Sequence, residues 1–473
     1  MSESLSCDLV VLGGGPGGYT AAFRAADLGL SVILVEQEER IGGVCLNVGC
    51  IPSKTLLHAA EIIEEAEAAA QYGLGFGTPS VDLDVLRGKK DDVVGKLTGG
   101  LASLAKKRKV RIVTGRGRFS SDRTLTVEND ADPAEIRFSS AIIAVGSRPV
   151  ELPFLPKDDG RIWDSTDALA LPFVPKRLAV LGGGIIGLEM AQVYAALGSR
   201  ITIIEMLDQI IPAADADLVR PLATKLKKRY DAVYTGTRLT AVEAGDEALS
   251  ISLEGPKAPE RIEADALLVS VGRRPNGAGI GAAEIGVTVD EKGFIPVNPR
   301  QETGVPGIYA IGDVAGEPML AHKAVHEGKV AAEVAAGLKS AFSAMTVPSV
   351  AYTNPEIAWA GYTEKQAEAE GIPYEKEAVP WAMSGRALSA DAALGTTKAL
   401  FHAETGRLIG AGITGARAGD LISEAVLAIE MGADAADIGA SVHPHPTFSE
   451  TLAFAAEMAE GTITDALPPK KKT

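Results

Sequence analysis

The chain has 473 residues, enough for three or four domains, and 46% of them are hydrophobic, so we expect sizeable cores and no global disorder. Its 46 lysine and arginine residues against 62 aspartate and glutamate residues leave a formal net charge of −16, which argues against nucleic acid or an anionic membrane as the main partner. No secretory leader, transit peptide or membrane-length apolar stretch is recognisable, and three cysteines are too few for a disulfide scaffold. We therefore expect a cytoplasmic protein in which any disulfide would be reactive.

The first residues have the pattern of a βαβ unit. The apolar run CDLVVLGGG (7–15) predicts a buried parallel strand that ends in a glycine-rich turn. TAAFRAADLG (20–29) predicts a helix that ends at its glycine, and SVILVEQ (31–37) predicts the next strand. We interpret Cys7, in the first strand, as a small buried hydrophobic residue.

The same unit returns in residues 177–205, RLAVLGGGIIGLEMAQVYAALGSRITIIE. In both copies 23 positions separate the first glycine of the turn from the glutamate that ends the second strand: Gly13 and Glu36 in the first, Gly182 and Glu205 in the second. A second pair of similar segments, AIIAVGSRP (141–149) and LLVSVGRRP (267–275), follows in the same order. These repeats predict two nucleotide-binding domains of similar build.

The remaining boundaries are softer. ELPFLPKDDG (151–160) has the composition of a linker, and IYAIGDVAG (308–316) predicts another buried strand followed by a helix. From about Val347 shorter strand candidates and helices predict a separate domain, and the final PPKKKT is expected to be solvated and without function. We therefore predict an α/β protein with two Rossmann-like dinucleotide-binding domains and a C-terminal α+β domain.

Both turns match the dinucleotide-binding pattern G-x-G-x-x-G between a strand and a helix. The first glycine allows the tight turn, the second lets the backbone approach a pyrophosphate, and the third lets helix and strand pack closely. These glycines are Gly13, Gly15 and Gly18 in the first turn and Gly182, Gly184 and Gly187 in the second. Glu36 and Glu205 are predicted to accept hydrogen bonds from ribose hydroxyls, and a carboxylate at Glu205 favours NAD over NADP because it repels a 2′-phosphate. The alternatives are plain structural turns and surface acids.

Two cysteines lie five positions apart in GGVCLNVGCIPSK (42–54), just beyond the first βαβ unit. A zinc site would need four ligands, and no second cysteine pair supplies them. Two buried structural thiols are a second interpretation, which the polar, glycine-rich neighbours disfavour. Two dinucleotides suggest a flavin and a nicotinamide in series, and a redox disulfide beside the flavin would explain both the pairing and the place of the cysteines. The spacing would let a helix turn bring the sulfurs together.

The segment GGVCLNVGCIPSK resembles the active-site signature of the flavin disulfide reductases, in the form CLNVGCIPSK found in the dihydrolipoyl dehydrogenases among them. The resemblance covers nearly the whole chain and includes GRGRF (115–119), AVGSRP, SVGRRPN, AIGDVAGEPMLAHKA and HPHPTFSETL (443–452). It implies an FAD-binding domain (1–150), an NAD-binding domain (151–275), a central domain that completes the FAD site (276–346) and a dimer-interface domain (347–473). One departure is Val44, where members commonly have a threonine.

The resemblance also implies the roles of single residues. Cys45 resembles the interchange thiol that substrate attacks, and Cys50 resembles its disulfide partner, which contacts the flavin. Lys54 resembles the lysine beside flavin N5, with Glu189 as its partner, and Asp313 resembles the acid on the flavin's ribityl-pyrophosphate side. Weaker contacts are implied for Gly117, Ser147 and Ala321 with FAD and for Gly272 with NAD.

The segment HPHPTFSE (443–450) holds two of the six histidines, and a proline lies on each side of His445. Disulfide exchange needs a base near neutral pH to form the attacking thiolate, and imidazole suits this role when a carboxylate orients it. The resemblance implies that His445 is this base, that Glu450 orients it, and that the pair serves the active site of the facing subunit of a homodimer. We interpret His443 as structural.

The implied reaction is oxidation of dihydrolipoamide by NAD⁺ through the Cys45–Cys50 disulfide and FAD. The implied partner is the lipoyl-bearing acyltransferase of a 2-oxoacid dehydrogenase complex; no metal, nucleic acid or membrane partner is expected. One alternative is a related reductase acting on glutathione, a similar disulfide or mercuric ion. Another, from a different class, is a non-catalytic scaffold that retains the fold.

Overall fold

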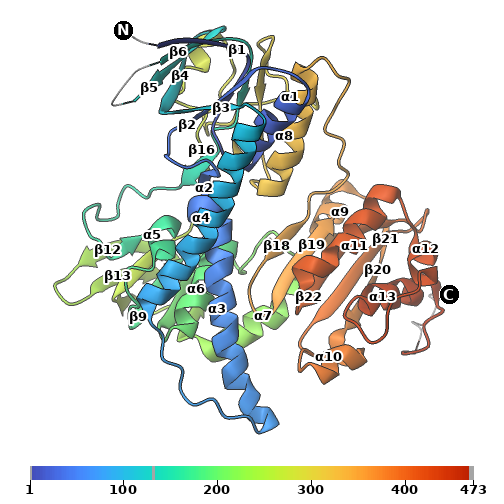
Figure 1. Cartoon of the computed structure of the whole chain (residues 1–473). Helices are drawn as coiled ribbons and strands as arrows, with labels where there is room; N and C mark the ends of the chain where they lie inside the picture. Colours follow the sequence, from blue (N-terminus) through green and yellow to red (C-terminus); the bar gives the residue numbers. More distant parts are fainter. Residues whose placement is uncertain (1–2, 130–133, 468–473) are drawn as a thin grey trace. The chain divides into compact units, whose positions relative to one another are not determined.

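The computed structural model describes residues 3–129 and 134–467, which form two compact units (Figure 1). Unit 1 combines Met1–Pro153, Asp164–Phe173 and Val271–Ser343, and unit 2 combines Phe154–Trp163, Val174–Ser270 and Ala344–Thr473. The predicted FAD-binding domain and the predicted central domain up to Ser343 thus fall in unit 1, and most of the other two predicted domains falls in unit 2. The division into four domains stays a prediction, and the segment PPKKKT lies outside the described residues.

Unit 1 is built on a seven-stranded sheet. Its strands are β1 (Glu3–Leu12), β2 (Val32–Glu36), β3 (Arg111–Thr114), β4 (Arg116–Ser121), β5 (Thr124–Glu128), β6 (Ala134–Ile143) and β17 (Ile308–Ala310). The order is β3-β2-β1-β6-β5-β4, and β17 pairs with β6. β1, β2, β3, β6 and β17 form parallel pairs, whereas β4, β5 and β6 pair antiparallel. The predicted first strand is therefore the buried centre of a parallel sheet, as expected.

The helices of unit 1 include the predicted helix after the first strand, which ends at the predicted glycine. They are α1 (Pro16–Asp27), α2 (Gly43–Val48), α3 (Cys50–Ala68), α4 (Leu83–Lys107), α5 (Ser165–Ala170) and α8 (Ala321–Ala335), with the short 3₁₀ turns η1 (Ala69–Tyr72), η2 (Ala283–Ile285) and η3 (Gly312–Val314). α1 begins at a proline and ends just before Gly29, whose φ of +92° terminates it as predicted. α3 and α4 run side by side as two long helices (Figure 1).

Helices α1 and α8 pack in parallel. Near their amino ends a Cβ at Gly17 would lie 2.9 Å from the carbonyl oxygen of Ala324, so only glycine permits this approach. Near their carboxyl ends Arg24 forms an ion pair with Glu333 at 2.7 Å. Because the two helices run in the same direction, both helices begin at the same edge of unit 1.

Unit 2 repeats the parallel arrangement. Its first sheet has the order β11-β10-β9-β15-β8, with every pair parallel. The strands are β8 (Ile162–Trp163), β9 (Arg177–Leu181), β10 (Arg200–Ile204), β11 (Ala232–Tyr234) and β15 (Ala266–Val269), with helices α6 (Ile185–Ala196) and α7 (Ala216–Arg229). A small antiparallel sheet consists of β12 (Arg238–Ala244), β13 (Leu249–Glu254) and β14 (Arg261–Ala264). β9, α6 and β10 confirm the predicted second βαβ unit.

The C-terminal part of unit 2 has the predicted α+β build. An antiparallel sheet has the order β18-β19-β22-β21-β20, and α11 packs on β19 and β22. The strands are β18 (Ser349–Ala351), β19 (Glu356–Gly361), β20 (Tyr374–Pro380), β21 (Thr396–His402) and β22 (Leu408–Gly415). The helices are α9 (Glu364–Glu370), η4 (Trp381–Met383), α10 (Gly385–Ser389), α11 (Ala418–Met431), α12 (Ala435–Ala440) and α13 (Glu450–Glu460).

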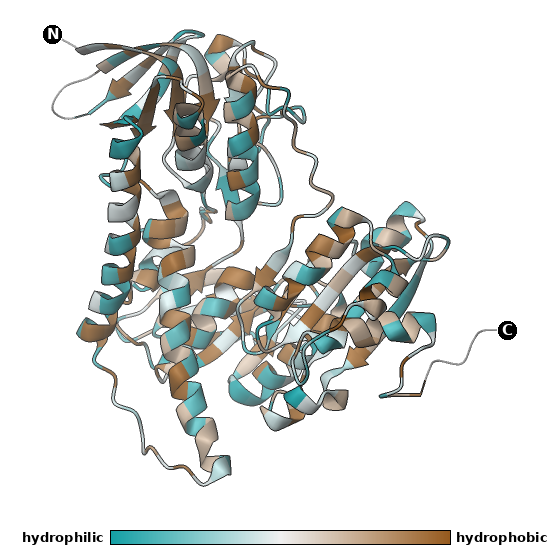
Figure 2. Ribbon diagram, turned by 45° about the vertical axis from the view of Figure 1, so that its right-hand side comes forward, coloured by the Kyte–Doolittle hydropathy of each residue, from teal (hydrophilic) through white to brown (hydrophobic). Residues whose placement is uncertain are grey.

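Each unit has its own core. In unit 1 apolar side chains of the parallel strands fill both faces of the sheet, and in the C-terminal part of unit 2 the core lies between the antiparallel sheet and helices α11, α12 and α13. Figure 2 shows hydrophobic residues concentrated on the strands, while the helices carry both kinds of residue along their length. This pattern fits sheets covered by amphipathic helices.

The second pair of repeated segments ends in two short strands that pair with each other. These are β7 (Ser147–Pro149) and β16 (Arg273–Pro275), which are antiparallel, with Pro275 opposite Ser147. The sequence repeat predicted two copies of one feature but not their pairing. This two-stranded ladder brings the segments SRP and RRP together within unit 1.

Candidate active site

The first glycine-rich turn joins β1 to α1 with almost no room for side chains. Gly13 has a φ of +107°, and a Cβ there would overlap the carbonyl group of Ala144. A Cβ at Gly18 would overlap the carbonyl oxygen of Gly13, so the helix packs directly on the end of the strand. Gly15 is the residue before α1 and has an extended conformation. The turn thus has the tight, side-chain-free geometry that the glycine pattern requires, and its contact with a dinucleotide stays a prediction.

Glu36 ends β2 with its carboxylate folded back on this turn. Its Oε2 accepts a hydrogen bond from the N–H of Gly14 at 2.7 Å, and its Oε1 accepts one from the N–H of Glu38 at 3.1 Å. Burial raises the pKa of Glu36, and these backbone donors oppose that effect. A carboxylate has about four acceptor positions, so the remaining lone pairs suit ribose hydroxyls.

The loop before α8, which carries the predicted flavin contact Asp313, is fixed by buried charges. The N–H of Gly312 donates to Glu327 at 2.7 Å, and Glu327 pairs with Lys323 at 2.9 Å. Lys323 donates to the carbonyl oxygen of Gly316 at 3.1 Å, so a buried ion pair fixes the loop that carries Asp313. The predicted contact Ala321 is the first residue of α8. Two parallel helix amino termini and a fixed acid at one edge fit a pyrophosphate and its attached polyol.

Asp313 is held by residues of the β7–β16 ladder. Ser147 Oγ donates to Asp313 Oδ2 at 2.5 Å, and Arg273 donates to both Ser147 Oγ and the Ser147 carbonyl oxygen at 2.7 Å. Ser147 and Asp313 were predicted separately, and the structure brings them together. Arg273 and the pair Lys323–Glu327 were missed, although the quoted segments SVGRRPN and AIGDVAGEPMLAHKA contain all but Glu327.

The cysteine segment is docked on the first glycine-rich turn. The N–H of Gly42 donates to the carbonyl oxygen of Gly14 at 2.8 Å, and a Cβ at Gly43 would lie 2.6 Å from the Cα of Gly15. Gly43 also has a φ of +57°, so both the close contact and the backbone conformation disfavour a side chain there. Helix α2, which carries Cys45, therefore starts against the predicted pyrophosphate-binding backbone.

The two cysteines lie on different helices, which corrects the expectation that one helix turn joins them. α2 ends at Val48, and Cys50 is the first residue of α3. Along one continuous helix, residues five apart point about 140° away from each other. The break at Gly49, where a Cβ would lie 2.8 Å from the carbonyl oxygen of Val44, lets the side chains of Cys45 and Cys50 meet.

The side chains of Cys45 and Cys50 are hydrogen-bonded to each other. The bond to Cys50 raises the pKa of Cys45 most strongly, burial and the charge of Cys50 raise it further, and the charge of Lys54 opposes them. The two thiols are therefore electrostatically coupled, and the separate roles of the two sulfurs stay a prediction.

The second glycine-rich turn, in unit 2, has the geometry of the first. Gly182 has the same φ of +107°, and a Cβ at Gly187 would overlap the carbonyl oxygen of Gly182. Glu205 Oε2 accepts from the N–H of Gly183 at 2.6 Å, and Oε1 accepts from the N–H of Leu207 at 2.8 Å. Gly184 precedes α6 as Gly15 precedes α1. The two predicted nucleotide sites are therefore built alike.

His445 and Glu450 form the predicted dyad in the C-terminal part of unit 2. His445 Nδ1 lies 2.7 Å from Glu450 Oε1, and Glu450 Oε2 accepts from the N–H of Thr447 at 2.6 Å. The side chain of His445 is 77% exposed, whereas that of Glu450 is only 12% exposed. A carboxylate held by backbone thus orients an imidazole whose Nε2 is accessible to a substrate.

The loop that carries the dyad is anchored to the sheet. Trp381 stacks on Phe448 with ring centroids 4.9 Å apart, and its Nε1 donates to Thr397 Oγ1 at 3.0 Å. Thr397 Oγ1 lies 2.7 Å from Thr451 Oγ1, in the first turn of α13. This buried network fixes the start of α13, where Glu450 is located.

His443 has a structural environment, as its interpretation expected. Its Nε2 lies 2.6 Å from Glu424 Oε1, and its Nδ1 lies 2.8 Å from the carbonyl oxygen of Ser441. Burial lowers the pKa of His443, but the hydrogen bond and charge of Glu424 outweigh it and raise the pKa overall. Both ring nitrogens are occupied, so His443 has no free nitrogen for a substrate.

Comparison with known proteins agrees with this geometry. Residues 7–328 match the profile of the pyridine nucleotide-disulphide oxidoreductases, and residues 347–456 match the dimerisation domain of that family. The chain belongs to this family. The dihydrolipoyl dehydrogenase of Vibrio cholerae is 52% identical over 473 residues, which cover 100% of this chain and 99% of the relative. Membership thus confirms the predicted fold class and provides this chain with a dimerisation domain.

Two solved structures share this fold over nearly the whole chain. The HOCl-induced flavoprotein disulfide reductase RclA from Escherichia coli, solved as a Cu(II) complex, has a TM-score of 0.85 at 26% identity, covering 97% of this chain and 100% of that one. LpdA from Mycobacterium tuberculosis has a TM-score of 0.88 at 24% identity, covering 96% and 99%, and shows the fold alone. In the described residues of this family member, none of the helices is both long and apolar enough to cross a membrane.

The weaker predicted contacts and the predicted Lys54 pairing stay predictions. Gly117 has a packing role of its own, because Leu12, Val35 and Leu125 occupy the space of a side chain. The carbonyl oxygen of Gly272 accepts from the N–H of Val150 at 3.1 Å within unit 1. Glu189 accepts from the N–H of Tyr352 at 3.2 Å in unit 2, whereas Lys54 belongs to unit 1.

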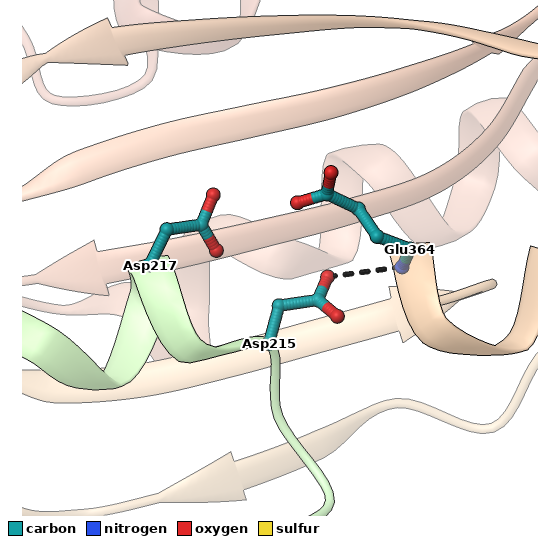
Figure 3. Close-up of side chains that lie close together, drawn as sticks. All are labelled: Asp215, Asp217 and Glu364. Carbon is teal, nitrogen blue, oxygen red and sulfur yellow. Dashed lines mark hydrogen bonds between the residues drawn. The ribbon is translucent and has the colours of Figure 1, made fainter. Parts of the chain in front are cut away.

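One cluster of acids has the spacing of a metal site. Asp215, Asp217 and Glu364 point toward one another in unit 2, and Asp215 accepts from the N–H of Glu364 at 3.1 Å (Figure 3). The ammonium of Lys398, which is 2% exposed, donates to all three carboxylates at 2.6, 2.7 and 2.9 Å. A lysine therefore supplies the positive charge here, and the cluster ties α7 and α9 to β21.

Replacing Lys398 with methionine is expected to lower the free energy of unfolding by about 3 to 5 kcal/mol near pH 7, because three acids lose their common cation. Burial lowers the pKa of Lys398, but its three hydrogen bonds outweigh this and raise it; burial raises the pKa of Glu364, but Lys376 and Lys398 lower it overall. The difference in unfolding free energy between wild type and Lys398→Met is therefore greatest between the unfolded-state pKa values of glutamate and lysine. It shrinks as the pH falls through the range in which the carboxylates become protonated. Urea unfolding at pH 7 and pH 4 tests this, with the exposed Lys365→Met as control; an equal loss at both pH values would contradict it.

Proposed function

We propose that this chain is a dihydrolipoyl dehydrogenase, which oxidises dihydrolipoamide to lipoamide and reduces NAD⁺. The observation that supports this most directly is the hydrogen-bonded pair Cys45 and Cys50, docked on the first dinucleotide-binding turn. Enzymes of this family use FAD and NAD(H), and the two glycine-rich turns have the geometry to bind one dinucleotide each. The full-length relatives at 52% identity support the choice of substrate.

The chain's own residues account for the exchange of sulfurs. His445 accepts the proton of one substrate thiol, and the resulting thiolate attacks Cys45 of the oxidised Cys45–Cys50 pair, so that Cys50 leaves as a thiolate. The second substrate thiolate then attacks the substrate sulfur of the mixed disulfide, which closes lipoamide and releases Cys45. Two electrons have passed from substrate to the cysteine pair. Bound FAD supplies the chemistry that transfers this electron pair to NAD⁺ as a hydride.

The protein supports this exchange by fixing charges. Glu450 orients His445 through the contact at 2.7 Å, and Cys50 carries the negative charge after the exchange because it is the sulfur that leaves as a thiolate. By the family resemblance, His445 acts on the cysteine pair of the other subunit, and the dimerisation domain supports a homodimer. We further propose a cytoplasmic location and docking to the acyltransferase of a 2-oxoacid dehydrogenase complex, because the substrate of such enzymes is carried on a separate lipoyl-bearing protein.

The nucleotide preference tests the role of Glu205. We expect kcat/KM for NAD⁺ to exceed that for NADP⁺ by at least about 100-fold, since a 2′-phosphate would meet the Glu205 carboxylate. Glu205→Ala should lower the ratio of kcat/KM for NAD⁺ to kcat/KM for NADP⁺ about tenfold or more, because activity with NADP⁺ rises relative to activity with NAD⁺. Steady-state rates of dihydrolipoamide oxidation provide the measurement, with the exposed Glu254→Ala as control. Equal rates with both nucleotides in the wild type would contradict the assignment.

The alternative substrates are distinguished by the same assay. A related reductase would be favoured if the enzyme reduced glutathione disulfide or mercuric ion with NADPH faster than it oxidised dihydrolipoamide with NAD⁺. A purified chain without flavin absorbance would favour the non-catalytic scaffold. The adjacent side chains of Cys45 and Cys50 and the His445–Glu450 dyad favour the catalytic interpretation over that scaffold.

A further inference from the structure

Arg273 is a half-buried cation for which neither the sequence analysis nor the proposed mechanism has a role. Its neighbour Arg274 is exposed and donates to the carbonyl oxygen of Glu291 at 3.3 Å, whereas Arg273 points to the other side of β16. On that side lie Ser147, Asp313 and the charge of Cys50. The two adjacent arginines therefore have different surroundings within one short strand.

The hydrogen bonds from Arg273 to Asp313 have a fixed direction. A guanidinium only donates and an ionised carboxylate only accepts, so the Ser147 hydroxyl must accept from Arg273 and donate to Asp313. Arg273 Nε reaches Ser147 Oγ at 2.7 Å, and a second guanidinium nitrogen reaches the Ser147 carbonyl oxygen at 2.7 Å. This two-point clamp sets the rotamer of Ser147, whose hydroxyl holds Asp313 Oδ2 at 2.5 Å. Asp313 Oδ1 stays outside the chain of bonds.

The charge of Arg273 also acts on the cysteine pair. Burial lowers the pKa of Arg273, and the negative charges of Asp313, Asp164 and Cys50 oppose this effect. Asp313 and Asp164 are the acids that face this guanidinium, and Lys54 is a further cation close to the cysteines. Because charge interactions are reciprocal, a cation that is stabilised by the Cys50 thiolate stabilises that thiolate in turn.

We propose that Arg273 is a positioning residue with two effects: it orients Asp313 through Ser147 toward the ribityl-pyrophosphate part of the flavin, and it stabilises Cys50 as a thiolate. The inference rests on the proposed function, in which Asp313 faces the flavin and Cys50 leaves as a thiolate. It assigns to one side chain a link between flavin binding and the redox state of the cysteines.

The test compares Arg273→Met with Arg273→Lys and with the matched control Arg274→Met, all as holoenzymes. The two-electron-reduced proteins are titrated with acid without oxygen, and the long-wavelength thiolate-to-flavin absorbance is followed. In Arg273→Met the pH midpoint is expected to rise by about one unit, since a nearby cation is lost. Arg273→Lys keeps the charge but not the clamp, so its midpoint stays within about 0.3 units of wild type.

Flavin affinity is measured separately by reconstitution of the apoproteins with FAD. We expect at least about tenfold weaker binding for both Arg273 variants, because a removed hydrogen-bonded charge contact costs about a factor of ten or more. Arg274→Met should equal wild type in both measurements, and circular dichroism and thermal unfolding show which variants are folded. A weaker affinity with an unmoved midpoint in Arg273→Met, or equality of Arg273→Met with Arg274→Met, overturns the proposal.

A flavin-independent reading separates this inference from the proposed function. The rate of Cys50 alkylation by iodoacetamide, identified by peptide mass, reports the same pH midpoint in the reduced protein. If the wild type fails to oxidise dihydrolipoamide but the alkylation midpoint of Arg273→Met rises, the proposed function fails and the role of Arg273 stands. If the wild type is active and neither midpoint moves, the role of Arg273 fails alone.

Discussion

Replacing Cys50 with serine is expected to lower the rate of dihydrolipoamide oxidation by a factor on the order of 10⁴ or more, because residues that act as one unit lose nearly all catalysis together. Without the second sulfur no disulfide forms with Cys45, and a substrate thiolate has no sulfur–sulfur bond to exchange with. The same change should abolish the long-wavelength band of the two-electron-reduced enzyme, since in the proposed mechanism Cys50 is the sulfur that leaves as a thiolate. Steady-state rates and anaerobic titration with dithionite provide the two measurements.

The partner variant Cys45→Ser sharpens this prediction. It should lose the same rate, but it retains the Cys50 thiolate and should therefore keep a long-wavelength band even before reduction. The control is Cys7→Ser, because Cys7 is a half-buried residue of β1 whose pKa burial raises to about 11, which makes its thiol inert near neutral pH. If the band persisted in Cys50→Ser or disappeared in Cys45→Ser, the roles assigned to the two sulfurs would have to be reversed.

Features set by local sequence periodicity could be predicted. The strand–turn–helix pattern around Gly13 and Gly182 has a local cause, because a φ of +107° and the contact of helix with strand require glycine at fixed spacing. The spacing to Glu36 and Glu205 follows from the length of one βαβ unit. The type and order of these elements can therefore be predicted from local sequence, although the contact of Gly13 with Ala144 is a distant one.

Features that depend on contacts across long stretches of sequence could not be predicted from periodicity. Arg273 and Ser147 are 126 positions apart, and Lys398 and Asp215 are 183 positions apart. No local sequence pattern therefore predicts either pairing. The dyad is the opposite case, because His445 and Glu450 are five positions apart and share one loop. The break at Gly49 was missed because glycine in a helical segment signals a break only when its neighbours leave no room for a side chain.

Loss of the base at His445 is the second large effect. His445→Gln is expected to lower kcat for dihydrolipoamide oxidation about 1,000-fold, within the usual range for a removed general base. Glu450→Gln should cost less, about 10- to 100-fold, because the imidazole remains but loses the carboxylate that orients it at 2.7 Å. His443→Gln is the control: it removes a bond to Glu424 at 2.6 Å and should lower stability while kcat stays within about threefold.

The subunit that supplies the base can be identified by mixing two inactive variants. A dimer with one Cys45→Ser and one His445→Gln subunit has one site with intact cysteines, and that site is complete only if His445 comes from the other subunit. Random reassociation of equal amounts makes half of the dimers mixed, each with one working site of two, so about a quarter of wild-type activity should return. Recovery must also disappear on dilution below the dissociation constant of the dimer. If His445 acted on the cysteines of its own subunit, the mixture would stay as inactive as either variant alone, and the dimerisation domain would have no direct role at the active site.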